Sequence, residues 1–159
     1  MLKEYSVRPI GVIHSPIKEA ADDCWGGVSA TIDLDPNQFT ADATIGLADY
    51  SHVEIVFLLD RMDPDKVITG ARHPRGRQDW PLVGIFAQRA KNRPNRIAIT
   101  VCKLESVRGL SIAVRELDAI DGTPVLDVKP YLSGFAPRGE VREPEWAKEL
   151  MAGYFRPQS

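Results

Sequence analysis

The densest group of side chains suited to binding lies in one connection, residues 84–96, which read GIFAQRAKNRPNR. Its four cations fall within eight positions, at Arg89, Lys91, Arg93 and Arg96. Pro94 restricts the residue before it to an extended conformation, and Asn95 is of a type that favours turns. The pattern predicts a stiff turn that projects positive charge toward substrate phosphates or a partner subunit.

These cations belong to a basic island in an acidic chain. Residues 61–96 hold nine Lys or Arg and three Asp, whereas residues 1–60 hold three Lys or Arg and ten Asp or Glu. Residues 72–77 (RHPRGR) stand shortly before Trp80, and cations beside an aromatic ring are typical of nucleic-acid surfaces. Arg75 and Arg77 are therefore candidate RNA contacts. The alternative for the island is a solvated surface whose cations pair with the acidic first third, and the alternative for residues 72–77 is a flexible surface loop anchored by a buried Trp80.

Two further groups lie beside predicted strands. Asp60 and Arg61 follow the apolar run 53–59, where a barrel presents side chains to a ligand at its rim; a solvated charge pair is the alternative. In residues 125–132 (VLDVKPYL), an extended backbone places Asp127, Lys129 and Tyr131 on one face. That face predicts either a ligand wall or an ordinary half-buried edge strand.

Several other chemistries lack their signatures. The three histidines, His14, His52 and His73, show no zinc-binding spacing, so we expect no metal. Ser51 and His52 are adjacent but lack the GxSxG turn of a hydrolase. The chain also has no GxGxxG and no GxxxxGK[ST] motif. A nucleotide or cofactor site must therefore be built without a glycine-rich loop.

Short apolar runs dominate the rest of the chain and predict its fold. Seven runs rich in β-branched residues are bounded by turn residues and predict strands, at 7–13, 28–34, 53–59, 83–87, 97–104, 110–117 and 125–128. One helix is predicted at 144–155, where Trp146, Leu150 and Tyr154 form an apolar stripe suited to core packing, and a weaker one at 36–42. The expected fold is mainly β, a small antiparallel β-barrel with one or two short helices, including a C-terminal helix.

Length and composition are those of one globular domain of 159 residues, with 43% hydrophobic and 26% charged residues. We expect a single domain over 1–159, with a core at 8–132 and an extension at 133–159. No apolar stretch approaches the length of a membrane helix, and the N-terminus lacks a signal-peptide core. The two cysteines form no disulfide framework. A cytoplasmic location without membrane contact is expected.

Four blocks of sequence resemble the TsaA-like family, also called the TrmO or YaeB family. They are IGVIHSP (10–16), YSHVEIVF (50–57), GIFAQRAKNRPNRI (84–97) and DGTPVLDVKPYL (121–132). The resemblance implies a β-barrel methyltransferase that uses S-adenosyl-L-methionine and works as a homodimer, with cofactor near the subunit interface. The family's best-known reaction methylates the exocyclic nitrogen of N6-threonylcarbamoyladenosine, next to the anticodon of certain tRNAs.

The resemblance also implies residue roles. It places the cofactor at Asp60 and Arg61, at Arg89, at the turn formed by Asp121, Gly122, Thr123 and Pro124, and near Asp23, Cys24 and Trp25. Substrate tRNA is expected at Arg75, Arg77, Arg93, Asn95, Lys129 and Tyr131. The catalytic residue is not identified by the sequence; His52 and Tyr131 are candidate general bases.

Two departures from the family's pattern leave other functions open. The common RPNP, followed by an apolar residue and Gly, is here RPNR-Ile-Ala, with Arg96 and Ala98. The better-known bacterial enzymes also carry a C-terminal domain that helps to hold tRNA, whereas about 27 residues follow Leu132 here. The alternatives are a non-catalytic barrel that binds S-adenosylmethionine or RNA, and a methyltransferase of a different small substrate.

Overall fold

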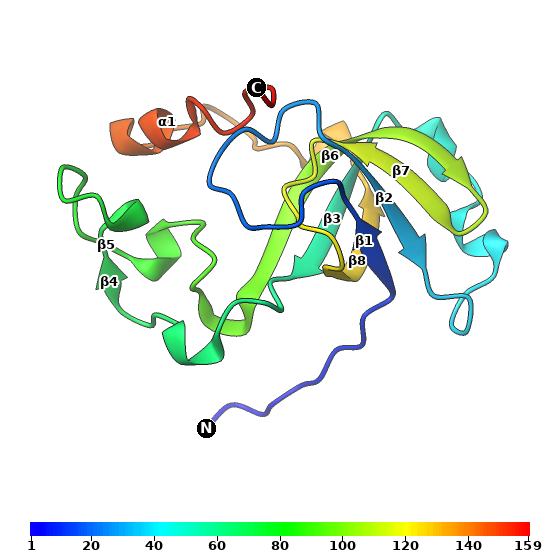
Figure 1. Cartoon of the computed structure of the whole chain (residues 1–159), viewed down its shortest axis with the longest axis horizontal. Helices are drawn as coiled ribbons and strands as arrows, with labels where there is room; N and C mark the ends of the chain where they lie inside the picture. Colours follow the sequence, from blue (N-terminus) through cyan, green and yellow to red (C-terminus); the bar gives the residue numbers. More distant parts are fainter.

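The computed structural model describes residues 1–159 and confirms a mainly β fold. Six strands close into an antiparallel barrel in the order β1-β2-β7-β6-β3-β8 (Figure 1). Their bounds are β1 Gly11–His14, β2 Ser29–Leu34, β3 His52–Leu58, β6 Ile97–Arg108, β7 Ser111–Arg115 and β8 Pro124–Pro130. A short pair of strands, β4 (Ala71–Arg72) and β5 (Val83–Gly84), lies outside the barrel.

The barrel forms because alternate residues of its strands are apolar and point inward. In β3, Val53, Ile55 and Phe57 are buried while the residues between them are half-buried. They join a core of 14 buried residues contributed by the barrel strands and by the segment that leads into β8. Burying each large apolar side chain contributes about 1.5–3 kcal/mol, so this alternation is what closes the sheet.

Two excursions from the barrel lie together on one of its sides (Figure 1). The first runs from the end of β3 to the start of β6 and contains β4, β5 and the 3-10 turns η3 (Pro64–Lys66), η4 (Pro74–Gly76), η5 (Ile85–Ala87) and η6 (Pro94–Arg96). The second is the C-terminal helix α1 (Glu145–Met151). Trp80 joins them, with its ring 6.3 Å from that of Trp146 and its indole N–H 2.8 Å from the Glu149 carboxylate.

The remaining short elements connect barrel strands. The 3-10 turns η1 (Ala41–Thr44) and η2 (Leu47–Asp49) link β2 to β3, and η7 (Ser133–Phe135) follows β8. Gly109, between β6 and β7, has a φ of 60°, which a glycine adopts without strain. The connection between these two strands is therefore a tight hairpin.

Several predicted boundaries were wrong. The run 83–87 forms only the two residues of β5 before it turns into η5, and the segment 36–42 forms no α-helix. The helix predicted at 144–155 ends at Met151 and buries none of its residues. Trp146 of its apolar stripe packs against Trp80, outside the barrel core. Tyr154 lies beyond the helix and has a polar partner, described below.

Candidate functional site

Three chain segments meet at the corner where β3 ends and β8 begins. The Arg61 guanidinium donates hydrogen bonds to the carbonyl oxygens of Lys18 and Asp121, each at 3.1 Å. The N–H of Asp121 donates to the carbonyl of Ile17 at 2.8 Å. Asp60 is exposed at the same corner. The structure therefore brings Arg61 to the Asp121–Pro124 turn, so two of the positions predicted to hold the cofactor lie together.

The Asp121 carboxylate shapes this turn. It accepts hydrogen bonds from the Lys18 ammonium at 2.7 Å and from the Ser15 N–H at 2.9 Å. The hydrogen bond from Lys18 lowers the pKa of Asp121 most, the one from Ser15 lowers it next, and the nearby His14 ring has a smaller effect. Gly122 has a φ of 83°, which favours glycine, and its N–H donates to Ile13 at 2.8 Å. The turn thus presents a fixed backbone edge at the barrel rim.

A second group of predicted cofactor residues surrounds Arg89. Its guanidinium donates to the carbonyl of Ile99 on β6 at 2.7 Å, which uses one of its five N–H groups. Thr100 follows Ile99 in β6, and its hydroxyl donates a hydrogen bond to the Asp118 carboxylate. The same carboxylate accepts a hydrogen bond from the Tyr154 hydroxyl. Burial, then the Asp118 charge, raises the pKa of Tyr154, while Arg89 and Arg75 lower it. These four charged and phenolic groups therefore share one polar cluster.

The predicted loop at Asp23, Cys24 and Trp25 is held by segments distant in sequence. Both terminal nitrogens of Arg75 lie 3.0 Å from an Asp23 carboxylate oxygen. The N–H groups of Cys24 and Trp25 donate to the carbonyls of Gly153 (3.2 Å) and Tyr154 (2.8 Å). The next residue is Gly26, where a Cβ would lie 2.1 Å from the carbonyl oxygen of Phe155. Glycine at this position is what allows the C-terminal segment to pack against the loop.

The predicted cofactor residues thus form two groups. One surrounds Arg61, and the other surrounds Arg89 and includes the loop at Asp23, which Arg75 and Tyr154 hold. The segment Asp118–Asp121 links them, and four residues span at most about 11 Å between their Cα atoms. The groups offer an exposed carboxylate at Asp60 and an exposed guanidinium at Arg89. Trp25 adds an indole N–H that is buried without a hydrogen-bond partner. These donors and this acceptor fit a ligand with a carboxylate, hydroxyl groups and a heterocyclic base.

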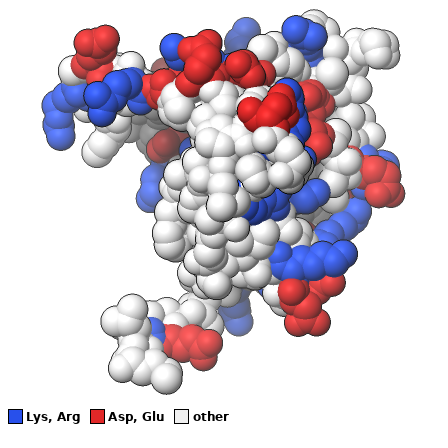
Figure 2. All heavy atoms as spheres, turned by 90° about the vertical axis from the view of Figure 1, so that its left-hand side faces the viewer, with Lys and Arg blue, Asp and Glu red and all other residues white.

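The predicted substrate residues do not form a single surface. Arg77 pairs with Asp79 and lies 3.9 Å over the Trp80 ring, and Arg93 donates to the Gln88 carbonyl at 2.7 Å. Arg75 is engaged with Asp23, and Lys129 lies 2.9 Å from Asp127. Asn95 is exposed with a φ of 62°. Figure 2 shows the basic side chains beside acidic ones around a largely uncharged centre on the face that carries both excursions.

The two candidate bases lie away from the Arg61 corner. Tyr131 follows β8 and donates its N–H to the His52 carbonyl at 3.0 Å, at the first residue of β3. The seven residues of β3 separate this position from the other end by about 20 Å. Within one chain, neither side chain therefore reaches the Asp121 turn.

Sequence reasoning missed four residues that shape the site, namely Ser15, Lys18, Asp118 and Tyr154. Asp118 stands three residues before Asp121 in the same LDAIDGTP stretch, which was the available signal for it. Tyr154 was predicted as an apolar helix residue, and its role depends on where the chain turns after α1. No signal in the sequence indicated that contact.

Two kinds of feature are absent from the structure. No three His, Cys, Asp or Glu side chains lie close enough together to hold a metal ion. None of the helices has the length and apolar character needed to cross a lipid bilayer.

Comparisons with known proteins match this chain to a family. The family described as "tRNA-methyltransferase O N-terminal domain" matches residues 13–136. RcsF of Pseudomonas aeruginosa is 36% identical over 135 residues, covering 80% of this chain and 55% of RcsF. A protein of Pyrococcus abyssi named as a probable S-adenosyl-L-methionine-binding protein is 32% identical over 140 residues, covering 85% of this chain and 72% of its own length.

A human relative carries a more specific name, tRNA (adenine(37)-N6)-methyltransferase. It is 37% identical over 100 residues, which cover 63% of this chain and 22% of the human protein. A crystal structure of TrmO from Pseudomonas aeruginosa superimposes with a TM-score of 0.73 at 30% identity, covering 92% of this chain and 63% of that one. This chain thus spans little more than half of RcsF and under two thirds of the crystallised TrmO chain. The barrel, the matched residues and these relatives together show that the chain belongs to the tRNA-methyltransferase O N-terminal domain family.

Proposed function

We propose that this protein is an S-adenosyl-L-methionine-dependent methyltransferase that acts on the exocyclic nitrogen of N6-threonylcarbamoyladenosine next to the tRNA anticodon. The observation that carries the proposal is the joining of Arg61 to the Asp121–Pro124 turn in a member of this family. The name of the human relative supports adenine 37 of tRNA as the target.

The cofactor supplies an electrophilic methyl group on a sulfonium sulfur. In this chain, the Arg89 guanidinium has unused N–H groups that suit a two-pronged contact with the cofactor carboxylate. The exposed Asp60 carboxylate suits the ribose hydroxyls or an amino group, and the Trp25 indole N–H suits an acceptor on the base. Asp121 is engaged by Lys18 and Ser15, so its part is to position the turn.

Methyl transfer by direct displacement requires mainly alignment of the two reactants, so no covalent nucleophile is needed. The nitrogen of a urea-substituted adenine is more acidic than that of a plain amine, and a modest base suffices to take its proton. His52 and Tyr131 lie at the far end of β3 in the same chain. Either residue serves as the base only if it comes from a second copy.

A homodimer is part of the proposal. The outward residues of β6, Ile97, Ile99 and Val101, are 41%, 39% and 43% exposed. Register places Val56 and Leu58 of β3 opposite Ile99 and Ile97, so the apolar strip continues onto the neighbouring strand. An apolar strip on an outer barrel face is typical of an interface, and a second copy that covers it would also shield the exposed Arg89 beside β6.

The turn at Arg96 is where this chain departs from the family's motif. Arg96 stands where the family's motif has proline, and its φ of 51° is one that proline cannot adopt. Its guanidinium donates to the Met62 carbonyl at 2.7 Å, which ties this turn to the segment after β3. The backbone next to the cofactor site therefore differs locally from that of RPNP-containing relatives.

Two measurements test the proposed function. Isothermal titration calorimetry with S-adenosylmethionine should detect binding, and no heat at millimolar ligand would exclude a cofactor site. Transfer of tritium from methyl-labelled cofactor into tRNA lacking this methyl group should place the label on the modified adenosine. Binding without transfer would instead support a non-catalytic binder, which the name of the Pyrococcus abyssi relative favours. Label in small molecules alone would indicate a different substrate.

A further inference from the structure

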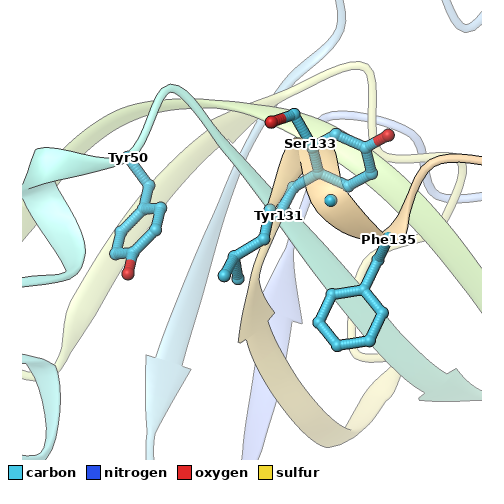
Figure 3. A pocket seen from close by; sticks show the side chains of 6 residues that line it. Tyr50, Tyr131, Ser133 and Phe135 are labelled. Carbon is cyan, nitrogen blue, oxygen red and sulfur yellow. The ribbon is translucent and has the colours of Figure 1, made fainter.

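An aromatic cavity lies at the end of the barrel opposite the Arg61 corner. Its walls come from Tyr50, before β3, and from the segment after β8, and its volume is about 550 Å³. In Figure 3 the rings of Tyr50 and Phe135 stand on opposite sides, with Tyr131 and Ser133 between them. Phe135 is 83% exposed and Tyr50 is 38% exposed. The cavity therefore offers open ring faces to solvent.

A row of polar side chains leads away from this cavity across the barrel. The N–H of Tyr131 bonds to His52, His52 pairs with Lys103 on β6, and Lys103 pairs with Arg115 on β7. Directly opposed residues of antiparallel strands point to the same face, and His52, Lys103 and Arg115 are all exposed on the outside of the barrel. With about 4.8 Å between strands, the row extends for about 14 Å.

The charges along this row favour an anionic ligand. Lys103 is exposed and makes no ion pair in the structure, whereas Arg115 donates to Glu105 at 2.7 Å. Glu54 of β3 lies opposite Lys129 on β8, and Lys129 also lies 2.9 Å from Asp127. Lys103, which lies opposite His52 in this row, is therefore a cation without an ion-pair partner.

We propose that the cavity and the row from Tyr131 to Arg115 bind a single-stranded segment of RNA. An unpaired base presents a planar face that stacks on the rings of Tyr50 and Phe135, and the phosphates that follow it lie along Lys103 and Arg115. Open rings beside an unpaired cation match this combination of flat base and anionic backbone. An apolar peptide would leave Lys103 without a counter-charge.

This inference rests on the proposed function only for the identity of the RNA as tRNA. The cavity lies about 20 Å from the Asp121 turn along β3. Phe135 and Lys103 are neither predicted cofactor residues nor candidate bases, so changing them should weaken RNA binding while the affinity for S-adenosylmethionine stays unchanged. That separation allows the two proposals to fail independently.

The test measures binding of the full chain to two fluorescently labelled RNAs, an unstructured single-stranded oligonucleotide and tRNA, by anisotropy over a series of salt concentrations. Phe135→Ala should weaken single-strand binding by about tenfold. Lys103→Glu should weaken it and reduce the slope of log affinity against log salt by about one. Tyr5→Ala, at a ring that is 81% exposed, and Lys148→Glu on α1 are the matched controls and should bind like the wild type.

Calorimetry with S-adenosylmethionine on the same variants completes the design. Unchanged RNA affinity in Phe135→Ala and Lys103→Glu would overturn the inference, even in a chain that methylates tRNA. Altered self-association with unchanged RNA affinity would also overturn it and would identify a protein partner as the occupant. If the two variants lose RNA binding and the wild type transfers no methyl group to tRNA, the RNA site stands and the proposed methyl transfer does not.

Discussion

Arg75 and Asp23, which are 52 positions apart, form a two-pronged ion pair with both nitrogen–oxygen distances at 3.0 Å. The pair connects the basic island to the loop that is predicted to contact the cofactor. Arg75 also donates to the Asp22 carbonyl at 2.8 Å and has a φ of 53°. An arginine predicted as an RNA contact thus has a structural role in holding this loop.

We expect Arg75→Ala to lower the free energy of unfolding by about 1–2 kcal/mol, because a part-buried charged hydrogen bond is lost and water screens some of its strength. Urea denaturation of both single mutants and of the Arg75→Ala/Asp23→Ala double mutant would give the coupling between them. The exposed pair Arg77–Asp79 is the control and should show no measurable coupling. Equal coupling in the two cycles would contradict the structural role of Arg75.

Arg89→Ala should reduce the affinity for S-adenosylmethionine by about tenfold or more, since hydrogen bonds to charged groups contribute about 1.5–3 kcal/mol. Calorimetry on the folded variant measures this effect. Arg108→Ala is a suitable control because it removes an exposed arginine at the last position of β6, away from the predicted cofactor residues. If both variants bind like the wild type, Arg89 does not contact the cofactor.

Asp121→Asn should destabilise the protein at neutral pH, and the difference from the wild type should shrink in acid. The Lys18 and Ser15 hydrogen bonds lower the pKa of Asp121 in the folded state. A depressed carboxyl pKa stabilises the fold above its unfolded value of about 3.9, and this contribution is lost as the pH falls through the folded value. Denaturation curves at pH 7 and pH 3 test this, with the exposed Asp42→Asn as control. A difference that is constant with pH would rule out this coupling.

Ile99→Glu should convert a dimer into a monomer, because it places a charge in the apolar strip on the outer face of β6. Sedimentation velocity over a range of concentrations measures the change. Val7→Glu alters an exposed apolar residue in the N-terminal segment, which is 68% exposed, and should leave the association state unchanged. A wild-type chain that sediments as a monomer throughout would remove the dimer from the proposed function.

The strand content of the fold was predictable because the barrel strands are short runs rich in β-branched residues that are bounded by turn residues. In β3 and β7 the buried residues fall at every second position, as one inward face of a strand requires. The run 83–87 was misassigned because a short apolar stretch fits a strand as well as a buried turn, and here Ile85 is buried within a 3-10 turn. Local pattern could not distinguish the two.

The sequence by itself determined the barrel and the DGTP turn, because periodicity and turn residues act over a few neighbouring positions. The tertiary structure alone decided which charges pair. Arg75 binds Asp23, Arg61 binds the backbone at Asp121, and Tyr154 binds Asp118 because barrel closure and the path of the C-terminal segment bring these distant positions together. Such contacts depend on the three-dimensional course of the whole chain, which no local pattern of residue types specifies.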